Sequence, residues 1–440
     1  MTDELKIEYE WLDRPEGDLE AGRACEAVIG IRLGDEYLTR LDDSWGQTVR
    51  NQMRVSAHTL ATWFASNWWR LRWEPETPGS RRDVDWRMSH CMAAAGAGYV
   101  WPNVIFASDG DSLAVASRPG RKAVAFEPVR YLNRIDGRIS AEEFERSVDQ
   151  FLEGVLSRLY SMNVPGDDLL ELWTEVMRER QDPKLTQWRK LEALCGYDPD
   201  EAPAAIIELL RDDNAGLGGE ALEEVAAVGR HATAKLLKPI LSLAKAVAAP
   251  RAGGFRGSMP TLTNKPRIAA GERPWQAATK LAQFARKEWG LENKPIKDKV
   301  LAGLLGLKSA VFAERAKSTA LPLALRAGTS DSFDIYFNSS WATSRRFACS
   351  RLIGDHLYFR NQGRLIPATD AKTSRQQFQR AFAQELLCPF DALLEKIQTE
   401  QPNEEDISEA AAYFEVSPLM VETTLVNKGE LDREVLSWRD

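Results

Sequence analysis

The sequence predicts an α+β protein that is predominantly helical and built from several parts. Short apolar runs typical of strands gather before about residue 135, whereas apolar residues at helical spacing dominate the rest of the chain. At 440 residues, the chain is also too long for one ordinary core. We therefore expect an α/β domain over residues 1–135, a helical domain over 136–248, a linker over 249–271 and a further domain over 272–440.

The first domain is expected to contain several strands. The runs ACEAVIGIRL (24–33), DSLAVASR (111–118) and AVAFEPVRYL (123–132) have the apolar, partly β-branched composition of strands. A turn is predicted at Asp109-Gly110, directly before the second of these runs.

The run WWRLRW (68–73) follows a helical pattern that ends near Asn67. Its alternation of aromatic and basic residues predicts a strand with one apolar face and one basic face. Such a strand on the surface is able to stack bases and contact phosphates. The alternative is a half-buried strand whose arginines meet solvent. The residues of the candidate basic and aromatic surface are Trp69, Arg70, Arg72 and Trp73, together with Arg345 and Arg346 farther along the chain.

The middle domain is predicted to be almost wholly helical. Its first helix begins with Ser140 as N-cap and Glu143 three residues later, which is the pattern of a capping box. Residues 249–268 interrupt the helical pattern with glycine, proline and basic residues, as a linker does.

Composition limits the classes of function. The net charge of −8 and the pI near 5.4 argue against a nucleic-acid binder overall, although a local basic face remains open. No membrane span and no signal peptide are predicted, so we expect a cytoplasmic protein. The five cysteines lack a C-x-x-C pair and are expected to be buried thiols. No P-loop, dinucleotide fingerprint or G-x-S-x-G motif occurs, and no cofactor is expected.

The last 169 residues predict a compact unit of helices with one clear strand, SFDIYFNSS. Four stretches in this region resemble, in the same order, an ImmA/IrrE-type zinc metallopeptidase. They are FARKEWGLENKPIKDKVLAGLLGL, DIYFNSSWATSRRFACSRLIGDH, FQRAFAQELLCP and AAAYFEVSPLMVETTL. The resemblance implies a zincin-like fold for residues 272–440. In that family two histidines of H-E-x-x-H bind zinc, the glutamate acts as base and a second helix supplies a third ligand.

The resemblance also implies that the zinc site is degenerate. The arginine-arginine-phenylalanine at 345–347 sets a register that puts Arg351 at the first histidine and Leu352 at the base. In this register Gly354 matches the family's glycine and Asp355 stands at the second histidine. Both histidine ligands and the base are therefore missing.

The third ligand is missing as well. Phe382, Glu385 and Pro389 set a register that puts Phe378 at the third ligand and Arg380 at the family's asparagine. No metal and no catalytic residue are therefore expected. The alternative is a displaced metal site.

That displaced site would use Asp355, His356 and Glu385. However, His356 lies about 100° around the helix from the second-ligand position, which favours an ordinary packed or surface histidine.

The replacements suggest a different use of the site. Arg351 and Asp355 are spaced i, i+4 and are expected to form an ion pair where the metal was lost. Basic residues outnumber acidic ones from 345 to 380, giving a cationic lining able to hold a phosphate, a nucleotide or an acidic peptide. The alternative is a solvated basic surface. The basic residues are Arg345, Arg346, Arg351, Arg360, Arg364, Lys372, Arg375 and Arg380.

The sequence thus favours a non-catalytic regulator or sensor whose degenerate peptidase-like domain binds a protein or an anionic ligand. The resemblance implies a setting in bacterial stress response or phage defence. One alternative is an enzyme with its active site within residues 1–135. Another is a nucleic-acid-binding protein, through the basic stretches or the helix–turn–helix pattern around Val416-Ser417-Pro418. Self-association into a homo-oligomer is compatible with the apolar helices.

Overall fold

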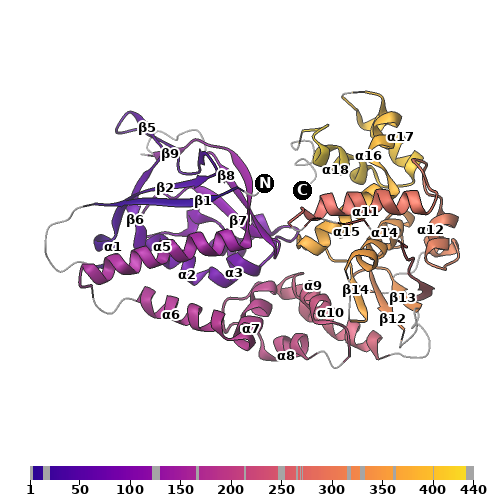
Figure 1. The fold of residues 1–440 in the computed structure, drawn as a ribbon, viewed down its shortest axis with the longest axis horizontal. Coiled ribbons are helices and arrows are strands. Elements are labelled where there is room, and N and C mark those ends of the chain that lie inside the picture. The colour runs from indigo at the N-terminus through magenta and orange to yellow at the C-terminus, as the bar shows by residue number, and fades with distance from the viewer. Residues whose placement is uncertain are drawn as a thin grey trace. The chain divides into compact units, whose positions relative to one another are not determined.

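The computed structural model describes residues 3–12, 20–120, 129–164, 168–212, 215–245, 253–263, 266–267, 269, 271–314, 319–327, 332–359, 363–399 and 401–432. These residues form a mixed α+β protein in which helices predominate, as predicted (Figure 1). They group into two compact units. The first is Met1–Arg211 with Ala226–Arg230 and Ala371–Thr373, and the second is Asp212–Val225, His231–Asp370 and Ser374–Asp440. The division into domains predicted from the sequence is finer than this grouping and stays a prediction.

The strands of the first unit form antiparallel sheets. In one sheet, β2 lies between β1 and both β3 and β6; in the others the orders are β10-β8-β7 and β5-β4-β9. The strands are β1 (Leu5–Trp11), β2 (Glu26–Leu33), β3 (Glu36–Tyr37), β4 (Leu41–Asp43), β5 (Thr48–Arg50), β6 (Met53–Ser56), β7 (Asn103–Ser108), β8 (Ser112–Arg118), β9 (Val129–Tyr131) and β10 (Ile135–Ser140).

Most of the strand predictions are confirmed here. β2 and β8 occupy the two expected runs, and Gly110 adopts a positive φ in the predicted turn before β8. β9 lies at the end of the third run, while residues 123–128 of that run lie outside the described residues.

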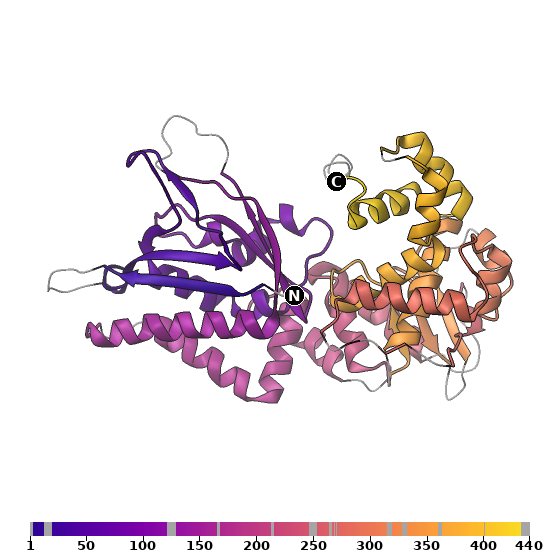
Figure 2. The same ribbon diagram turned by 45° about the horizontal axis from the view of Figure 1, so that its top comes forward.

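Helices cover the sheets of the first unit. They are α1 (Ala21–Ala24), α2 (Ala57–Ser66), α3 (Trp68–Trp73), α4 (Val84–His90), α5 (Ala141–Ser161), α6 (Asp168–Gln181), α7 (Pro183–Leu194) and α8 (Ala204–Arg211), with 3-10 turns η1 (Ser80–Arg82) and η2 (Met92–Ala94). Figure 2 shows α5 running along the sheet that contains β1 and β2.

Four phenylalanines join α2, β7 and α5 in the centre of the first unit. Phe64 contacts Phe106, Phe144 and Phe151, and Phe106 contacts Phe144, with ring centroids 5.9 to 6.4 Å apart. All four rings are fully buried. Large aromatic side chains in tilted or edge-to-face contact provide much of the apolar area that stabilises such a core.

The start of α5 confirms only half of the predicted capping box. Ser140 Oγ accepts a hydrogen bond from the Glu143 backbone N at 3.1 Å, as expected of an N-cap. The Glu143 carboxylate instead accepts from the backbone N of Leu5 and from Ser147 Oγ, both at 3.2 Å. Glu143 therefore holds β1 against α5.

The strand predicted over residues 68–73 is wrong, because these residues form helix α3. Asn67 separates α3 from α2, and the chain resumes helical geometry directly after it. Both arginines of this helix are buried against carboxylates from other parts of the chain, Arg70 against Asp198 and Arg72 against Glu145, so the basic residues do not form a solvated face. The alternation of aromatic and basic residues therefore reflects contacts with distant segments, which the local sequence pattern does not reveal.

The second unit contains one antiparallel sheet in the order β11-β13-β12-β14 among its described residues. Its strands are β11 (Phe255–Ser258), β12 (Leu323–Arg326), β13 (Ser332–Tyr336) and β14 (Leu365–Pro367). β13 is the strand predicted from SFDIYFNSS. β11 lies within the predicted linker and differs from that expectation, because it pairs with β13 along its whole length.

Helices form most of the rest of the second unit. They are α9 (Gly219–Ala226), α10 (Arg230–Ala244), α11 (Pro274–Glu288), α12 (Asp298–Leu304), α13 (Ala310–Ala313), α14 (Ala342–Tyr358), α15 (Ser374–Leu387), α16 (Phe390–Ile397), α17 (Glu404–Phe414) and α18 (Pro418–Lys428). In the described part of the chain, no helix has both the length and the apolar character needed to cross a bilayer.

A glycine sets the close approach of α14 and α15. A Cβ added at Gly354 of α14 would lie 2.5 Å from Cδ1 of Phe382 on α15. Phe382 is itself fully buried. The two helices therefore depend on the absence of a side chain at this position.

We expect Gly354→Ala to lower the free energy of unfolding by about 1–3 kcal/mol, because an added methyl overpacks the contact with Phe382. The control is Gly303→Ala in α12, where an added Cβ meets nothing within 4 Å. That variant should be neutral or more stable by up to about 1 kcal/mol. Urea unfolding measures both, and equal stability of the two variants would contradict this packing argument.

Candidate functional site

A fully buried aspartate joins α14 to α15 in the second unit. Asp355 of α14 accepts two hydrogen bonds from the Arg375 guanidinium, Nε to Oδ2 at 2.7 Å and Nη2 to Oδ1 at 2.8 Å. Gln379 Nε2 donates to the same Oδ2 at 2.7 Å. Arg375 and Gln379 are spaced i, i+4, so both side chains leave the same face of α15. The result is a forked ion pair with a third donor, which suits a carboxylate removed from water.

Arg351 lies one turn before Asp355 on α14 and reaches the segment after β14. Its Nη2 donates to the Thr369 carbonyl oxygen and to Gln376 Oε1. Arg380 Nη1 donates to the same carbonyl oxygen at 3.3 Å. Two guanidinium groups thus meet at one neutral acceptor. We call Arg351, Arg375 and Arg380 the arginine cluster.

The electrostatics of the arginine cluster differ from one member to the next. Burial, with the nearby charge of Arg380, lowers the pKa of Arg351 to about 9. Burial also lowers the pKa of Arg380. For Arg375 burial acts in the same direction, but the charge and hydrogen bonds of Asp355 outweigh it and raise the pKa. The pKa of Arg375 is therefore shifted in the opposite direction to the pKa values of the other two arginines.

Several buried polar atoms at or near the arginine cluster make no hydrogen bond within the described part of the chain. Among the described residues, Arg351 Nε, Thr369 Oγ1 and Gln379 Oε1 are buried atoms that make no hydrogen bond. Buried polar atoms in folded proteins are almost always paired, so three such atoms in one place require an explanation. A site that accepts a further polar ligand is one explanation.

The ion pair predicted between Arg351 and Asp355 is wrong, since Asp355 pairs with Arg375. The i, i+4 spacing allows a pair along α14, but the close packing of α15 brings a better-aligned guanidinium to Asp355. From the sequence, Arg375 was identified only as one of several basic residues, and Gln376, Gln379 and Thr369 were not identified as site residues. The i, i+4 spacing of Arg375 and Gln379 is the sequence feature that could have indicated a shared site on one face of α15.

Other predicted site residues point elsewhere. Phe378 stacks on Tyr358 with ring centroids 4.2 Å apart and packs into the core. Glu385 accepts from Gln283 Nε2 at 2.9 Å, and His356 lies edge-on to Phe333. The displaced metal site of Asp355, His356 and Glu385 is therefore not assembled. In the described residues, no three His, Cys, Asp or Glu side chains are arranged to hold a metal ion.

Arg345 and Arg346 do not form a solvated basic surface, because both are fully buried. Arg345 donates to the carbonyl oxygens of Ser339 and Val311, at 2.8 and 2.6 Å. Arg346 donates to backbone carbonyl oxygens and pairs with Asp298. These side chains satisfy carbonyl groups at loop and helix ends, which fixes them inside the unit. Arg360 lies outside the described residues.

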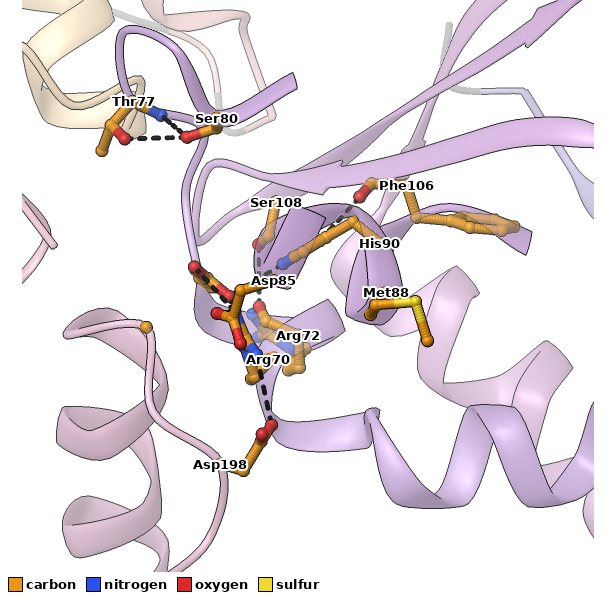
Figure 3. A network of polar contacts seen from close by, with 12 residues as sticks. Arg70, Arg72, Thr77, Ser80, Asp85, Met88, His90, Phe106, Ser108 and Asp198 are labelled. Carbon is orange, nitrogen blue, oxygen red and sulfur yellow. Dashed lines mark hydrogen bonds and ion pairs between the residues drawn. The ribbon is translucent and has the colours of Figure 1, made fainter. Parts of the chain in front are cut away.

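A second polar network lies in the first unit, around α3 and α4 (Figure 3). Arg70 is buried and forms ion pairs with Glu74, Asp85 and Asp198, at 2.7, 2.9 and 3.3 Å. His90 Nε2 faces Glu74 Oε2 at 2.9 Å, and its Nδ1 faces the Phe106 carbonyl oxygen at 2.9 Å. Burial would raise the pKa of Glu74, but hydrogen bonds and charges of His90 and Arg70 hold it below its ordinary value.

The neighbouring residues of α3 are equally engaged. Trp69 Nε1 donates to Glu179 at 2.8 Å, and Arg72 donates to Glu145 at 2.6 Å and to the Gly110 carbonyl oxygen at 2.8 Å. The basic and aromatic surface predicted from Trp69, Arg70, Arg72 and Trp73 is therefore wrong. These side chains tie segments of the first unit together, and the first three are buried.

Comparison with known protein families, with curated proteins and with solved structures finds no match for this chain. We therefore infer its function from the residues and their geometry.

We expect Asp355→Asn to lower the free energy of unfolding by about 3–5 kcal/mol, because it leaves the buried Arg375 charge without its counter-ion. The matched control is Asp136→Asn, which breaks an exposed aspartate–arginine pair with Arg118. An exposed pair contributes only about 0–1 kcal/mol. Urea unfolding distinguishes the two, and a similar small loss for both would contradict the importance given to Asp355.

We expect Glu385→Gln to stabilise the protein at pH 7. Burial raises the pKa of Glu385 above its ordinary value, so ionisation is harder in the folded than in the unfolded state. The unfolded chain then loses the proton first, and stability falls as pH rises from the unfolded pKa, about 4.3, toward the folded pKa. The gain in Tm of Glu385→Gln over wild type should shrink as the pH falls from 7 toward the unfolded pKa. The control Glu395→Gln, which changes an exposed glutamate, should show no such trend.

Proposed function

We propose that the second unit binds an acidic segment of another protein at the arginine cluster, and that the chain acts as a non-catalytic regulator or sensor. The observation that carries this proposal is the gathering of three buried or partly buried arginines at the contact of α14 and α15. Arg375 pairs with the fully buried Asp355, while Arg351 and Arg380 share the Thr369 carbonyl oxygen. Guanidinium groups bind carboxylates through two parallel hydrogen bonds, so an excess of them favours a carboxylate ligand.

The resemblance to ImmA/IrrE-type metallopeptidases supports the absence of zinc chemistry. Arg351 and Phe378 stand where that family has metal ligands, and neither side chain has a lone pair to offer zinc. Leu352 stands at the base and cannot take a proton. The same resemblance motivates a setting in bacterial stress response or phage defence. In this proposal a site that once held a cation has become one that holds an anion.

An acidic protein segment suits the cluster better than a nucleic acid. The basic stretches that motivated nucleic-acid binding are residues 67–73 and 345–380. Within them Arg70, Arg72, Arg345 and Arg346 are occupied by interactions inside the units. The overall charge of −8 also opposes the approach of a polyphosphate. An active site in residues 1–135 remains the alternative, with the network around His90 and Glu74 as its place.

We expect the protein to bind a synthetic glutamate-rich peptide, and Arg380→Gln to weaken the affinity about tenfold or more, because a hydrogen bond to a charged group contributes about 1.5–3 kcal/mol. Arg380 is only half-buried and its replacement spares the Asp355 pair. The control, Lys287→Gln, removes one exposed charge from α11 of the same unit. Isothermal titration at two salt concentrations measures both variants. No binding, or equal affinity for Arg380→Gln and wild type, would overturn the proposal.

A further inference from the structure

Residues 215–226 of the second unit reach the arginine cluster from a distant part of the sequence. Their first part lies beside β14, the outermost strand of its sheet. The backbone N of Arg364 donates to the Gly216 carbonyl oxygen at 2.9 Å, and that of Leu365 donates to the Leu217 carbonyl oxygen at 3.1 Å. The segment is not itself a strand, since Gly216 has a left-handed φ of 62°, but these two backbone hydrogen bonds hold it against the start of β14.

A contact between two glycines lets the segment approach so closely. A Cβ on Gly218 would lie 2.9 Å from the Gly363 Cα, and Gly218 has a positive φ of 97°. A side chain at either position would push the two backbones apart. After this contact the chain turns directly into α9.

The acidic face of α9 lies toward the arginine cluster. Glu220 Oε2 is 3.9 Å from Arg375 Nη1. Glu224 is buried, with 8% of its surface exposed, and its charge favours the charged form of all three arginines of the cluster. On the other side of α9, Leu222 and Val225 are fully buried. Glutamates are rarely buried without a cationic partner, so the arginine cluster explains this placement.

We propose that residues 215–226 are an internal stand-in for the acidic partner, and that the partner binds by displacing them. This inference rests on the proposed function of the arginine cluster and names the class of partner. The partner supplies the same two features, a backbone stretch whose carbonyl groups accept from the N–H groups of Arg364 and Leu365, and a following helix with carboxylates on one face. Charge complementarity with the cluster and these two backbone donors together select such a segment.

The internal segment lowers the apparent affinity of the site for an external partner. Because it is tethered, it competes at an effective concentration that reaches the millimolar range for short connections. The apparent affinity for a partner is reduced by the fraction of molecules in which the segment occupies the site. Weakening the segment must therefore strengthen binding of the external ligand.

The probe for the test is a peptide with the chain's own sequence over residues 215–227, AGLGGEALEEVAA. The variants are Glu220→Gln, which changes an exposed side chain, and the double variant Glu220→Gln with Glu224→Gln. We expect the single variant to bind the peptide more tightly than wild type, and the double variant to bind at least about tenfold more tightly, the factor that corresponds to about 1.4 kcal/mol. Glu208→Gln on α8 makes the same change at another exposed glutamate and should leave the affinity unchanged.

Amide hydrogen exchange on isotope-labelled protein with unlabelled peptide gives the second readout. A helix as short as α9 is unstable once detached from its packing, so saturating peptide should accelerate exchange at Leu222–Val225. Equal affinities for wild type and both variants, with these amides still protected at saturation, would overturn the stand-in while the proposed function stands. Absence of peptide binding by every variant would overturn the proposed function itself, and this inference with it.

Discussion

The buried pair of Asp355 and Arg375 is the constraint around which the second unit is arranged. An ionised carboxylate removed from water is stable only when its oxygens are fully paired. The two guanidinium hydrogen bonds, with the third from Gln379, meet that need and fix the relative rotation of α14 and α15. The absence of a side chain at Gly354 lets the helices come close enough for these bonds to form. Packing and charge at this helix pair therefore depend on each other.

Buried arginines with several acceptors recur in both units. In the first unit, Arg70 joins α3 to Asp85 and Asp198, and Arg189 of α7 joins Glu179, Glu192 and Asp200. In the second, Arg346 joins α14 to Asp298 and Glu415. Such networks contribute less to stability than their number suggests, because each buried ion must first be dehydrated. They impose strict geometry, since a misplaced partner leaves a charge unpaired. The arginine cluster differs from them because Arg351 and Arg380 share one neutral acceptor, the Thr369 carbonyl oxygen.

Much of the local structure follows from the sequence. The N-cap at Ser140, the turn at Gly110, strand β13 and the helices α11, α14, α15, α17 and α18 were predicted, because each depends on neighbours along the chain. The errors share one cause. Residues 68–73 form a helix because carboxylates at positions 145, 179 and 198 neutralise and bury it. Likewise, the partner of Asp355 is decided by how α15 packs on α14, and the contact of α9 with the cluster spans about 150 residues of sequence. Spacing along the chain predicts which residues share a face, but not which distant segment meets that face.

The close contact of Gly218 and Gly363 allows the sensitivity of the protein to its ligand to change independently of its ligand specificity. The arginine cluster decides which ligand is held, whereas the two glycines govern how firmly the internal segment lies against β14. A methyl group at Gly218 loosens that segment without altering any residue that contacts an acidic partner, because Gly218 belongs to the internal segment alone. Selection acting on this one position is therefore able to adjust the sensitivity of the protein while the specificity set by the arginine cluster stays constant.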